Sequence, residues 1–194
     1  MCSIPRKGVR RLGHSKRVHN LKRILNAGSG SDTYGTDFVD INPKRRSVKR
    51  CDFNTERLPY KDNTFDKVYS REVIAHLYAP MHFLKECYRV LKPNGELYLT
   101  TDSAGFWGTF GKVYFGGYDD SKTYGKNDSV FYLHTTKTLE NLLKKAGFRT
   151  VEVSYEIIKP VGEEPKPISH RIFMRTVATF NKRLKSHVVA NAFK

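Results

Sequence analysis

The sequence is poor in cysteine and has no long apolar run. It contains three cysteines, Cys2, Cys51 and Cys87, and none of them has the Cys-x-x-Cys spacing of a zinc or redox motif. This excludes a disulfide-built scaffold and favours buried or incidental thiols, and no metal site is predicted. No apolar run approaches the roughly 20 residues of a membrane-spanning helix, and the basic N-terminus lacks the apolar segment of a secretory signal. We therefore expect a cytoplasmic protein.

Acidic residues are absent from both ends of the chain. Residues 1–23 contain eight Lys or Arg and residues 165–194 contain seven, with no Asp or Glu in either segment. Because the part between them is nearly neutral, the ends carry almost all of the net charge of +16. Basic ends on a neutral body favour a polyanionic partner such as RNA, DNA or an anionic membrane surface. The alternative is solvated tails that only raise solubility.

The length of 194 residues suits a single domain with a sizeable core. Apolar or β-branched segments bounded by turn residues predict strands at residues 23–27, 37–41, 48–51, 66–70, 95–101 and 149–157. Apolar residues at three- and four-residue spacing predict helices near residues 81–91 and 139–146, the second ending at Gly147. This alternation indicates an α/β fold with a parallel sheet.

Three successive predicted strands end in residues that suit one nucleotide-type ligand. The first runs into Gly28-Ser29-Gly30, where glycine lets the backbone approach a ligand without a Cβ atom. The second ends at Asp40, which can accept both hydroxyls of a ribose, and the third is followed by Asp52, which can accept the amino group of adenine. A Gly-x-Gly turn alone is equally typical of an ordinary tight turn, so the prediction depends on the ordered set.

Longer segments resemble the class I S-adenosylmethionine-dependent methyltransferases, specifically the small type 11 family. The similar segments are residues 58–70 (LPYKDNTFDKVYS), 72–77 (EVIAHL), 86–97 (ECYRVLKPNGEL) and 136–148 (TKTLENLLKKAGF). Asn94 stands where the family has a glycine. The resemblance implies a Rossmann-like three-layer α/β sandwich with a mostly parallel seven-stranded sheet, closed by an antiparallel last strand near the C-terminus.

The resemblance also implies S-adenosylmethionine as the cofactor and a set of residues that bind it. These residues are Asn26, Gly28, Ser29, Gly30, Asp40, Ile41, Asp52, Phe53, Ser70 and Arg71. Asn26 departs from the acid often found before this glycine motif. His76 and His134 are the candidate general bases for an acceptor that must lose a proton; the alternatives are packing for His76 and helix capping for His134.

The connection after the first strand is unusually short. Only seven residues separate Gly30 from Phe38, whereas a parallel crossover ordinarily takes a dozen or more. The first crossover helix is therefore expected to be shortened or missing. We expect either residues 31–36 or a basic N-terminal arm, residues 1–22, to close that side of the cofactor pocket.

The methyltransferase domain is expected to span residues 23–194 and to contain a long insertion. Residues 103–134 interleave aromatic residues with glycines, which favours a substrate lid over a purely structural excursion. Residues 166–194 are interpreted as a basic helix followed by the last strand. The alternative to a role of this helix in binding is that it packs against the sheet as part of the core.

These features favour a methyltransferase whose acceptor is a small molecule or a nucleic acid, RNA in particular. Base-amino DNA methylation is disfavoured because no Asn/Asp-Pro-Pro-aromatic motif follows the fourth strand, and cytosine C5 methylation because no Pro-Cys pair is present. One alternative is a catalytically degenerate cofactor-binding module that binds a polyanionic partner. Another is an NAD-type dehydrogenase, since a ribose-binding acid also fits that class.

Overall fold

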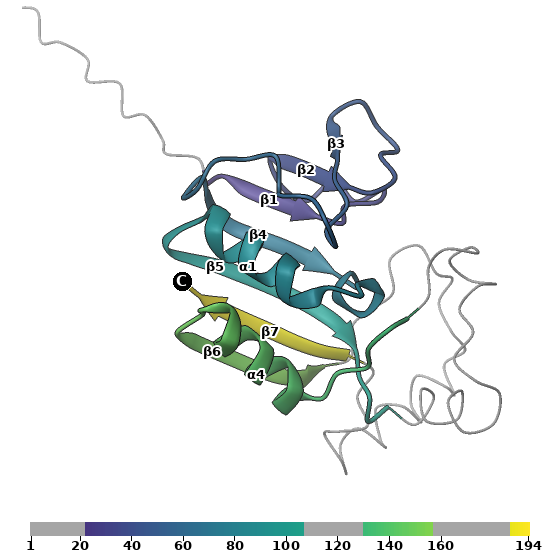
Figure 1. Ribbon diagram of the computed structural model, residues 1–194, viewed down its shortest axis with the longest axis vertical. Helices are drawn as coiled ribbons and strands as arrows, with labels where there is room; N and C mark the ends of the chain where they lie inside the picture. Colours follow the sequence, from purple (N-terminus) through teal and green to yellow (C-terminus); the bar gives the residue numbers. More distant parts are fainter. Residues whose placement is uncertain (1–21, 107–129, 157–186) are drawn as a thin grey trace, which may run out of the picture.

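The computed structural model describes residues 22–106, 130–156 and 187–194, in which seven strands form one sheet of order β3-β2-β1-β4-β5-β7-β6 (Figure 1). The strands are β1 (Ile24–Ala27), β2 (Asp37–Asp40), β3 (Val48–Arg50), β4 (Phe65–Arg71), β5 (Leu91–Asp102), β6 (Thr150–Glu156) and β7 (His187–Phe193). The pairs from β3 to β5 are parallel, and β7 runs antiparallel to both β5 and β6. The predicted mostly parallel, seven-stranded sheet is confirmed.

Two α-helices lie on the same face of this sheet, α1 (Pro80–Val90) and α4 (Thr136–Ala146), and a short 3-10 helix, η1 (Ile74–His76), precedes α1 (Figure 1). Pro80 suits the first turn of α1, where its missing N–H has no helical partner to lose. Thr135 and Thr138 form a reciprocal capping box at the start of α4, and Gly147 ends it with a left-handed φ of 114°. Thr135, and not His134, therefore caps this helix.

The core lies between the sheet and these helices. Its large, fully buried side chains include Leu25, Val39, Phe65, Val68, Phe83, Leu84, Leu97, Leu99, Leu139 and Leu143. Cys51 and Cys87 are free and buried, in line with the sequence, and burial raises the pKa of the Cys51 thiol to about 11. Neither thiol has the low pKa that would make it a reactive nucleophile.

A buried ion pair fastens α1 to the segment before β4. Glu86 is 8% exposed and accepts hydrogen bonds from Arg89 Nε (2.9 Å) and Nη2 (2.7 Å) and from the Leu58 amide (2.9 Å). Arg89 Nη1 also donates to the Tyr60 carbonyl and to Asp62. Burial by itself would raise the pKa of Glu86, but these donors hold it below its usual value. Glu86 and Arg89, which belong to the family-like segment 86–97, therefore have a structural role: they hold α1 against the segment before β4.

The connection from β1 to β2 contains no helix, as its length predicted. The buried Asn26 side chain donates from Nδ2 to the Tyr34 carbonyl (2.9 Å), and the Thr36 amide donates to the Ile24 carbonyl (2.8 Å). The Tyr34 ring lies 4.6 Å from that of Tyr69 on β4. Residues 31–36 are therefore held against β1 by main-chain and side-chain hydrogen bonds.

Strand β5 begins directly after α1, four residues earlier than the predicted strand. Leu91 pairs with Phe65, and the register then shifts between Phe65 and Lys67, which takes up the expected turn as an irregularity within the strand. Asn94 has a left-handed φ of 62°, a conformation that asparagine tolerates better than most residues. This accounts for asparagine at the position of the family's glycine.

Some sequence predictions fall outside the described residues. They are the arm at residues 1–21, the middle of the insertion at residues 107–129, and the basic helix expected before β7 within residues 157–186. Among the described helices, none is long and apolar enough to cross a membrane.

Candidate active site

The predicted site residues gather at one edge of the sheet. Strands β2, β1, β4 and β5 are adjacent and parallel, so their carboxyl ends meet at this edge, and the antiparallel β7 begins there. The strand order reverses direction between β1 and β4. Ligands of open α/β sheets bind at such a switch point, outside the carboxyl ends of the strands.

The Gly28-Ser29-Gly30 loop turns sharply at the end of β1. The amides of Gly28 (2.8 Å) and Ser29 (3.2 Å) both donate to the Val39 carbonyl of β2. Gly28 has a φ of 81°, and a Cβ atom there would collide with the Val73 side chain after β4. Gly30 has a φ of 50° and faces open space, with no heavy atom within 4 Å of a built Cβ. Gly28 thus serves the packing of the loop, and Gly30 leaves room for a ligand.

Asp40 is joined to this loop by its carboxylate. Oδ2 accepts from the Gly30 amide (2.7 Å), and Oδ1 accepts from the Asn42 amide (2.8 Å). Each carboxylate oxygen can accept more than one hydrogen bond, so Asp40 retains capacity for two ligand hydroxyls. The Gly30 and Asn42 amides also fix the orientation of the Asp40 carboxylate.

Asp52 stabilises its own turn at the end of β3. Its Oδ1 accepts from the Asn54 amide (2.9 Å), while its amide donates to Glu56 Oε2 (2.7 Å). Phe53 is 6% exposed and packs on Phe83 with ring centroids 4.9 Å apart, so its ring belongs to the core. Ile41, which follows Asp40, is 43% exposed and offers an apolar surface at the same edge.

Three hydroxyls near this edge are buried without a hydrogen-bond partner in the described part of the chain. They belong to Ser29 in the glycine loop, 3% exposed, and to the fully buried Ser70 and Thr101 near the ends of β4 and β5. An unsatisfied buried hydroxyl is costly, so such atoms point to a ligand or water that satisfies them. The Asn26 amide nitrogen, by contrast, donates to the Tyr34 carbonyl, which gives this residue a structural role in the loop.

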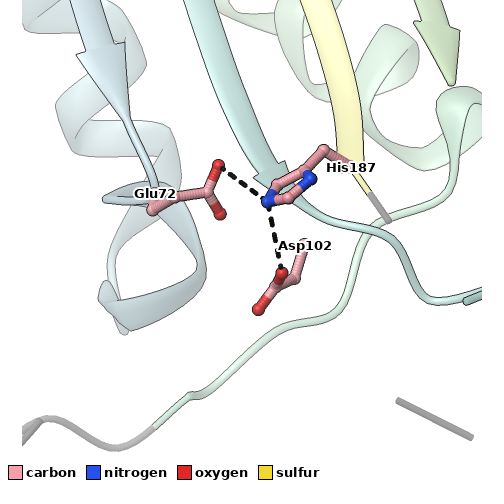
Figure 2. A group of neighbouring side chains, drawn as sticks. All are labelled: Glu72, Asp102 and His187. Atoms are coloured by element: carbon pink, nitrogen blue, oxygen red, sulfur yellow. Dashed lines mark ion pairs between the residues drawn. The ribbon is translucent and has the colours of Figure 1, made fainter. Parts of the chain in front are cut away.

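Three further polar side chains converge where β4 and β5 end and β7 begins: Glu72, Asp102 and His187 (Figure 2). His187 Nε2 lies 3.9 Å from Glu72 Oε1 and 3.9 Å from Asp102 Oδ1. Partial burial raises the pKa of Glu72 to about 7, and burial lowers the pKa of His187 against the opposing effect of Asp102. This edge therefore holds ionisable groups with shifted pKa values, as functional sites often do.

The two histidines predicted as bases lie in the segments that follow β4 and precede α4. His76 ends η1 and is half-buried. His134 is 3% exposed, forms an isolated β-bridge with Ser103 at the end of β5, and has no hydrogen-bond partner for Nε2 among the described residues. Burial lowers the pKa of His134, so the ring is neutral near pH 7 and can accept a proton.

A basic cluster lies beyond β2, at Lys44, Arg45 and Arg46. Arg45 Nη2 donates to the Asp32 carbonyl (2.6 Å), and its guanidinium stacks 4.9 Å from the Phe38 ring centroid. Lys44 and Arg46 flank this fixed arginine. The cluster borders the Asp40 end of the site with positive charge.

Glu72, Asp102 and His187 were missed as site residues by the sequence. The rule that found Asp40 and Asp52, a polar residue at the carboxyl end of a strand, applies equally to Glu72 and Asp102 and would have found them. No local signal marks His187. Its place beside Asp102 depends on the antiparallel register of β5 and β7.

A family model described as "Methyltransferase domain" matches residues 19–99. A tRNA U34 carboxymethyltransferase of Syntrophotalea carbinolica is 34% identical over 176 aligned residues, covering 75% of this chain and 51% of the relative. The chain spans between 31% and 51% of the length of three curated relatives with this name.

Solved structures of methyltransferases share this fold, among them the following two. A possible histamine N-methyltransferase from Thermotoga maritima superposes with a TM-score of 0.60 at 22% identity, covering 89% of this chain and 82% of the other. An S-adenosylmethionine-dependent methyltransferase from Archaeoglobus fulgidus has a TM-score of 0.61 at 16% identity, covering 89% and 86%.

Proposed function

Because the chain belongs to the class I S-adenosylmethionine-dependent methyltransferases of the type 11 family, we propose that it transfers a methyl group from S-adenosylmethionine to an RNA acceptor. The cofactor is that of the family. The acceptor is the part of the proposal that needs further argument.

The main support for a cofactor site is the hydrogen bond between the glycine loop and Asp40. The Gly30 amide holds the Asp40 carboxylate at 2.7 Å beside open space. The unpartnered hydroxyls of Ser29 and Ser70 lie along the same edge. The site thus offers the Asp40 carboxylate, the hydroxyls of Ser29 and Ser70, and open space at Gly30, which has no Cβ atom. These groups fit a ligand with a ribose and a polar amino-acid end.

Bound at this edge, S-adenosylmethionine supplies a methyl group on a positively charged sulfur, and the protein has only to align it with the acceptor. Asp40 would bind the ribose hydroxyls, and Ile41 and Asp52 would contact the adenine. Phe53 would contribute through its main chain because its ring is buried. Ser70 and Arg71, at the end of β4, would border the methyl group.

For an acceptor that must lose a proton, His134 is the base that we assign. It lies beside the end of β5, its ring is buried and neutral near pH 7, and Nε2 has no other described partner. His76 is the second candidate, by its place in η1.

An RNA acceptor is supported by charge and by exposed rings. The net charge is +16, and Lys44, Arg45 and Arg46 border the cofactor end. Tyr78 and Phe131 are 54% and 52% exposed with ring centroids 6.2 Å apart, at a place where nucleotide bases could stack. The described ends of the proposed lid, residues 103–106 and 130–134, start from this same edge, so we propose that the lid contacts the acceptor. A relative named for tRNA modification points the same way, and such a substrate accords with a cytoplasmic site of action.

The cofactor proposal is tested by calorimetric titration with S-adenosylhomocysteine. We expect one site per chain and at least about tenfold weaker binding in Asp40→Ala, since losing a pair of hydrogen bonds to a charged group costs about 1.5–3 kcal/mol. Asp37→Asn is the matched control, because Asp37 lies at the other end of β2 and pairs with Arg23. Unchanged binding in Asp40→Ala would contradict this site.

The acceptor is tested by incubating the protein with methyl-labelled S-adenosylmethionine and a cell extract, then separating RNA, protein and small molecules. We expect label in RNA that nuclease releases. Label among small molecules would instead identify a metabolite acceptor. Cofactor binding without label in any fraction would favour the alternative, a catalytically degenerate module that binds a polyanion.

A further inference from the structure

The Glu72, Asp102 and His187 side chains come from three different strands and meet at one point. Glu72 directly follows β4, Asp102 ends β5 and His187 begins β7. One ligand-type atom from each lies within 4.8 Å of the other two (Figure 2). All three side chains are half-buried. They therefore form a small polar cluster that remains in reach of solvent.

The backbone turns Glu72 toward this cluster against the ordinary alternation of a strand. Ser70 pairs with Leu99, so the two side chains lie on the same face of the sheet. Strict alternation would place Glu72, two residues after Ser70, on that face as well. Glu72 instead has a left-handed φ of 53°, and its Oε1 accepts from Thr100 Oγ1 at 2.5 Å. Thr100 and Asp102 share the other face of β5, and His187 pairs directly with Asp102. The left-handed turn thus delivers the carboxylate to its two partners.

The distances do not suit a network of direct hydrogen bonds among the three. Both carboxylate oxygens face the same nitrogen, His187 Nε2, and each is 3.9 Å from it, beyond hydrogen-bond reach. A single N–H could also donate well to only one of them. Two carboxylates and an imidazole nitrogen separated by such gaps leave room for a shared cation between them.

We propose that Glu72, Asp102 and His187 bind a divalent metal ion at the acceptor edge of the sheet. Bonds of about 2.1 Å from a metal to N or O allow two ligand atoms to lie at most about 4.2 Å apart. Two of the three pairs already satisfy this limit at 3.9 Å. The two carboxylates also outweigh the positive charge of the neighbouring Arg71.

The ligand set indicates which ions suit the site. Imidazole with two carboxylates suits Mn²⁺, Fe²⁺ or Zn²⁺ better than Ca²⁺, which prefers an all-oxygen shell. The Thr100 hydroxyl orients the Glu72 carboxylate as an outer partner. Three protein ligands leave coordination positions for water or for a substrate oxygen.

A role for the ion rests on the proposed methyltransferase function, although its binding does not. A divalent ion beside the methyl-transfer position would hold an oxygen of the acceptor and lower the pKa of a hydroxyl there. The site therefore favours a hydroxyl-bearing acceptor, such as a ribose, over an amine.

Metal binding is tested by calorimetric titration of the full chain with MnCl₂ and with ZnCl₂, after removal of metal by a chelator. We expect one site per chain for the wild type, and at least about tenfold weaker binding in His187→Ala and in Asp102→Asn, because each removes one of three ligands. His82→Ala is the matched control, since His82 lies on α1 and contacts the Glu56 carbonyl. Equal binding by the wild type and both variants, or no saturable binding by the wild type, would overturn the proposal.

A second readout identifies the histidine directly. With Mn²⁺ bound, pulsed electron paramagnetic resonance should detect imidazole nitrogen coupling in the wild type and in His82→Ala, and none in His187→Ala. Nitrogen coupling that persists in His187→Ala would overturn the assignment. Titration of the same samples with S-adenosylhomocysteine shows that the variants are folded. It also separates the two proposals, since metal binding without cofactor binding would refute only the proposed function.

Discussion

Gly28 and Gly30, in the turn directly after β1, both have left-handed backbones, but only Gly28 is closely packed. Gly28→Ala would combine backbone strain with a collision against Val73, and Gly30→Ala would add strain alone. We expect Gly28→Ala to lower the free energy of unfolding by about 2–4 kcal/mol and Gly30→Ala by about 1 kcal/mol. Urea unfolding of both variants measures the difference.

The same two variants distinguish an effect on stability from an effect on cofactor binding. Because Gly30 faces open space beside Asp40, Gly30→Ala should weaken S-adenosylhomocysteine binding by more than its stability loss suggests. Equal stability losses in the two variants would mean that Val73 moves aside. That result would remove the packing explanation for Gly28.

His134 should make the stability of the protein depend on pH. Burial lowers its pKa in the folded state below the ordinary value of 6.5. The unfolded chain therefore binds more protons at this residue as the pH falls through 6.5, and stability is lost in that direction. Above about pH 7.5 both states are neutral and the contribution vanishes.

We expect the free energy of unfolding of the wild type to decrease relative to that of His134→Gln as the pH falls from about 7 to about 5. Urea unfolding at the two pH values measures this difference, with His82→Gln as a control for removing a histidine elsewhere. An identical pH dependence in wild type and His134→Gln would show that folding does not lower the pKa of His134.

At the scale of elements, the connection from β1 to β2 does without a helix because Asn26 holds it. The Asn26 amide donates to the Tyr34 carbonyl, and Thr36 closes back onto Ile24. An acid at this position, as is common in the family, would place a buried carboxylate against a carbonyl oxygen. The asparagine is therefore coupled to the shortened crossover.

We expect Asn26→Asp to lower the free energy of unfolding by about 3 kcal/mol, because it removes the donor and buries an unpaired charge. Asn26→Ala, which removes the donor without adding charge, should cost less. Urea unfolding and S-adenosylhomocysteine titration of both variants provide the test. Tighter cofactor binding by Asn26→Asp without loss of stability would return Asn26 to the cofactor site, as the resemblance implied.

At the scale of the whole molecule, the charge of +16 should appear as salt-dependent RNA binding. Deleting residues 1–15 removes four basic residues. If these contact phosphates, the slope of log affinity against log salt should fall by about three. Titrations of tRNA between about 50 mM and 200 mM salt measure the slope.

The matched control replaces Lys85 and Lys145, which are exposed on α1 and α4, with glutamine. It should leave the slope nearly unchanged, because these lysines lie on the helix-covered face. An unchanged slope after deletion of residues 1–15 would support the alternative that the basic arm only raises solubility.

Most elements could be predicted because their signals are local. The strands alternate or run apolar between turn residues, α1 and α4 repeat at helical spacing, and Gly147 marks a helix end. The missing crossover helix followed from counting residues between Gly30 and Phe38. The start of β5 was wrong because its pairing with Phe65, across an irregular register, overrides the local turn signal.

The sequence by itself determined the order of strands and helices, the resemblance to the methyltransferase family, and the loop and carboxylate of the candidate cofactor site, since each depends on residues close together in the chain. Tertiary structure alone decided that Asn26 serves Tyr34, that Phe53 belongs to the core, and that Glu72 turns toward Thr100. It also brought His187 to Asp102, 85 positions earlier in the chain. Sheet register sets the position of His187 and a left-handed turn sets that of Glu72, and neither leaves a periodic pattern in the sequence.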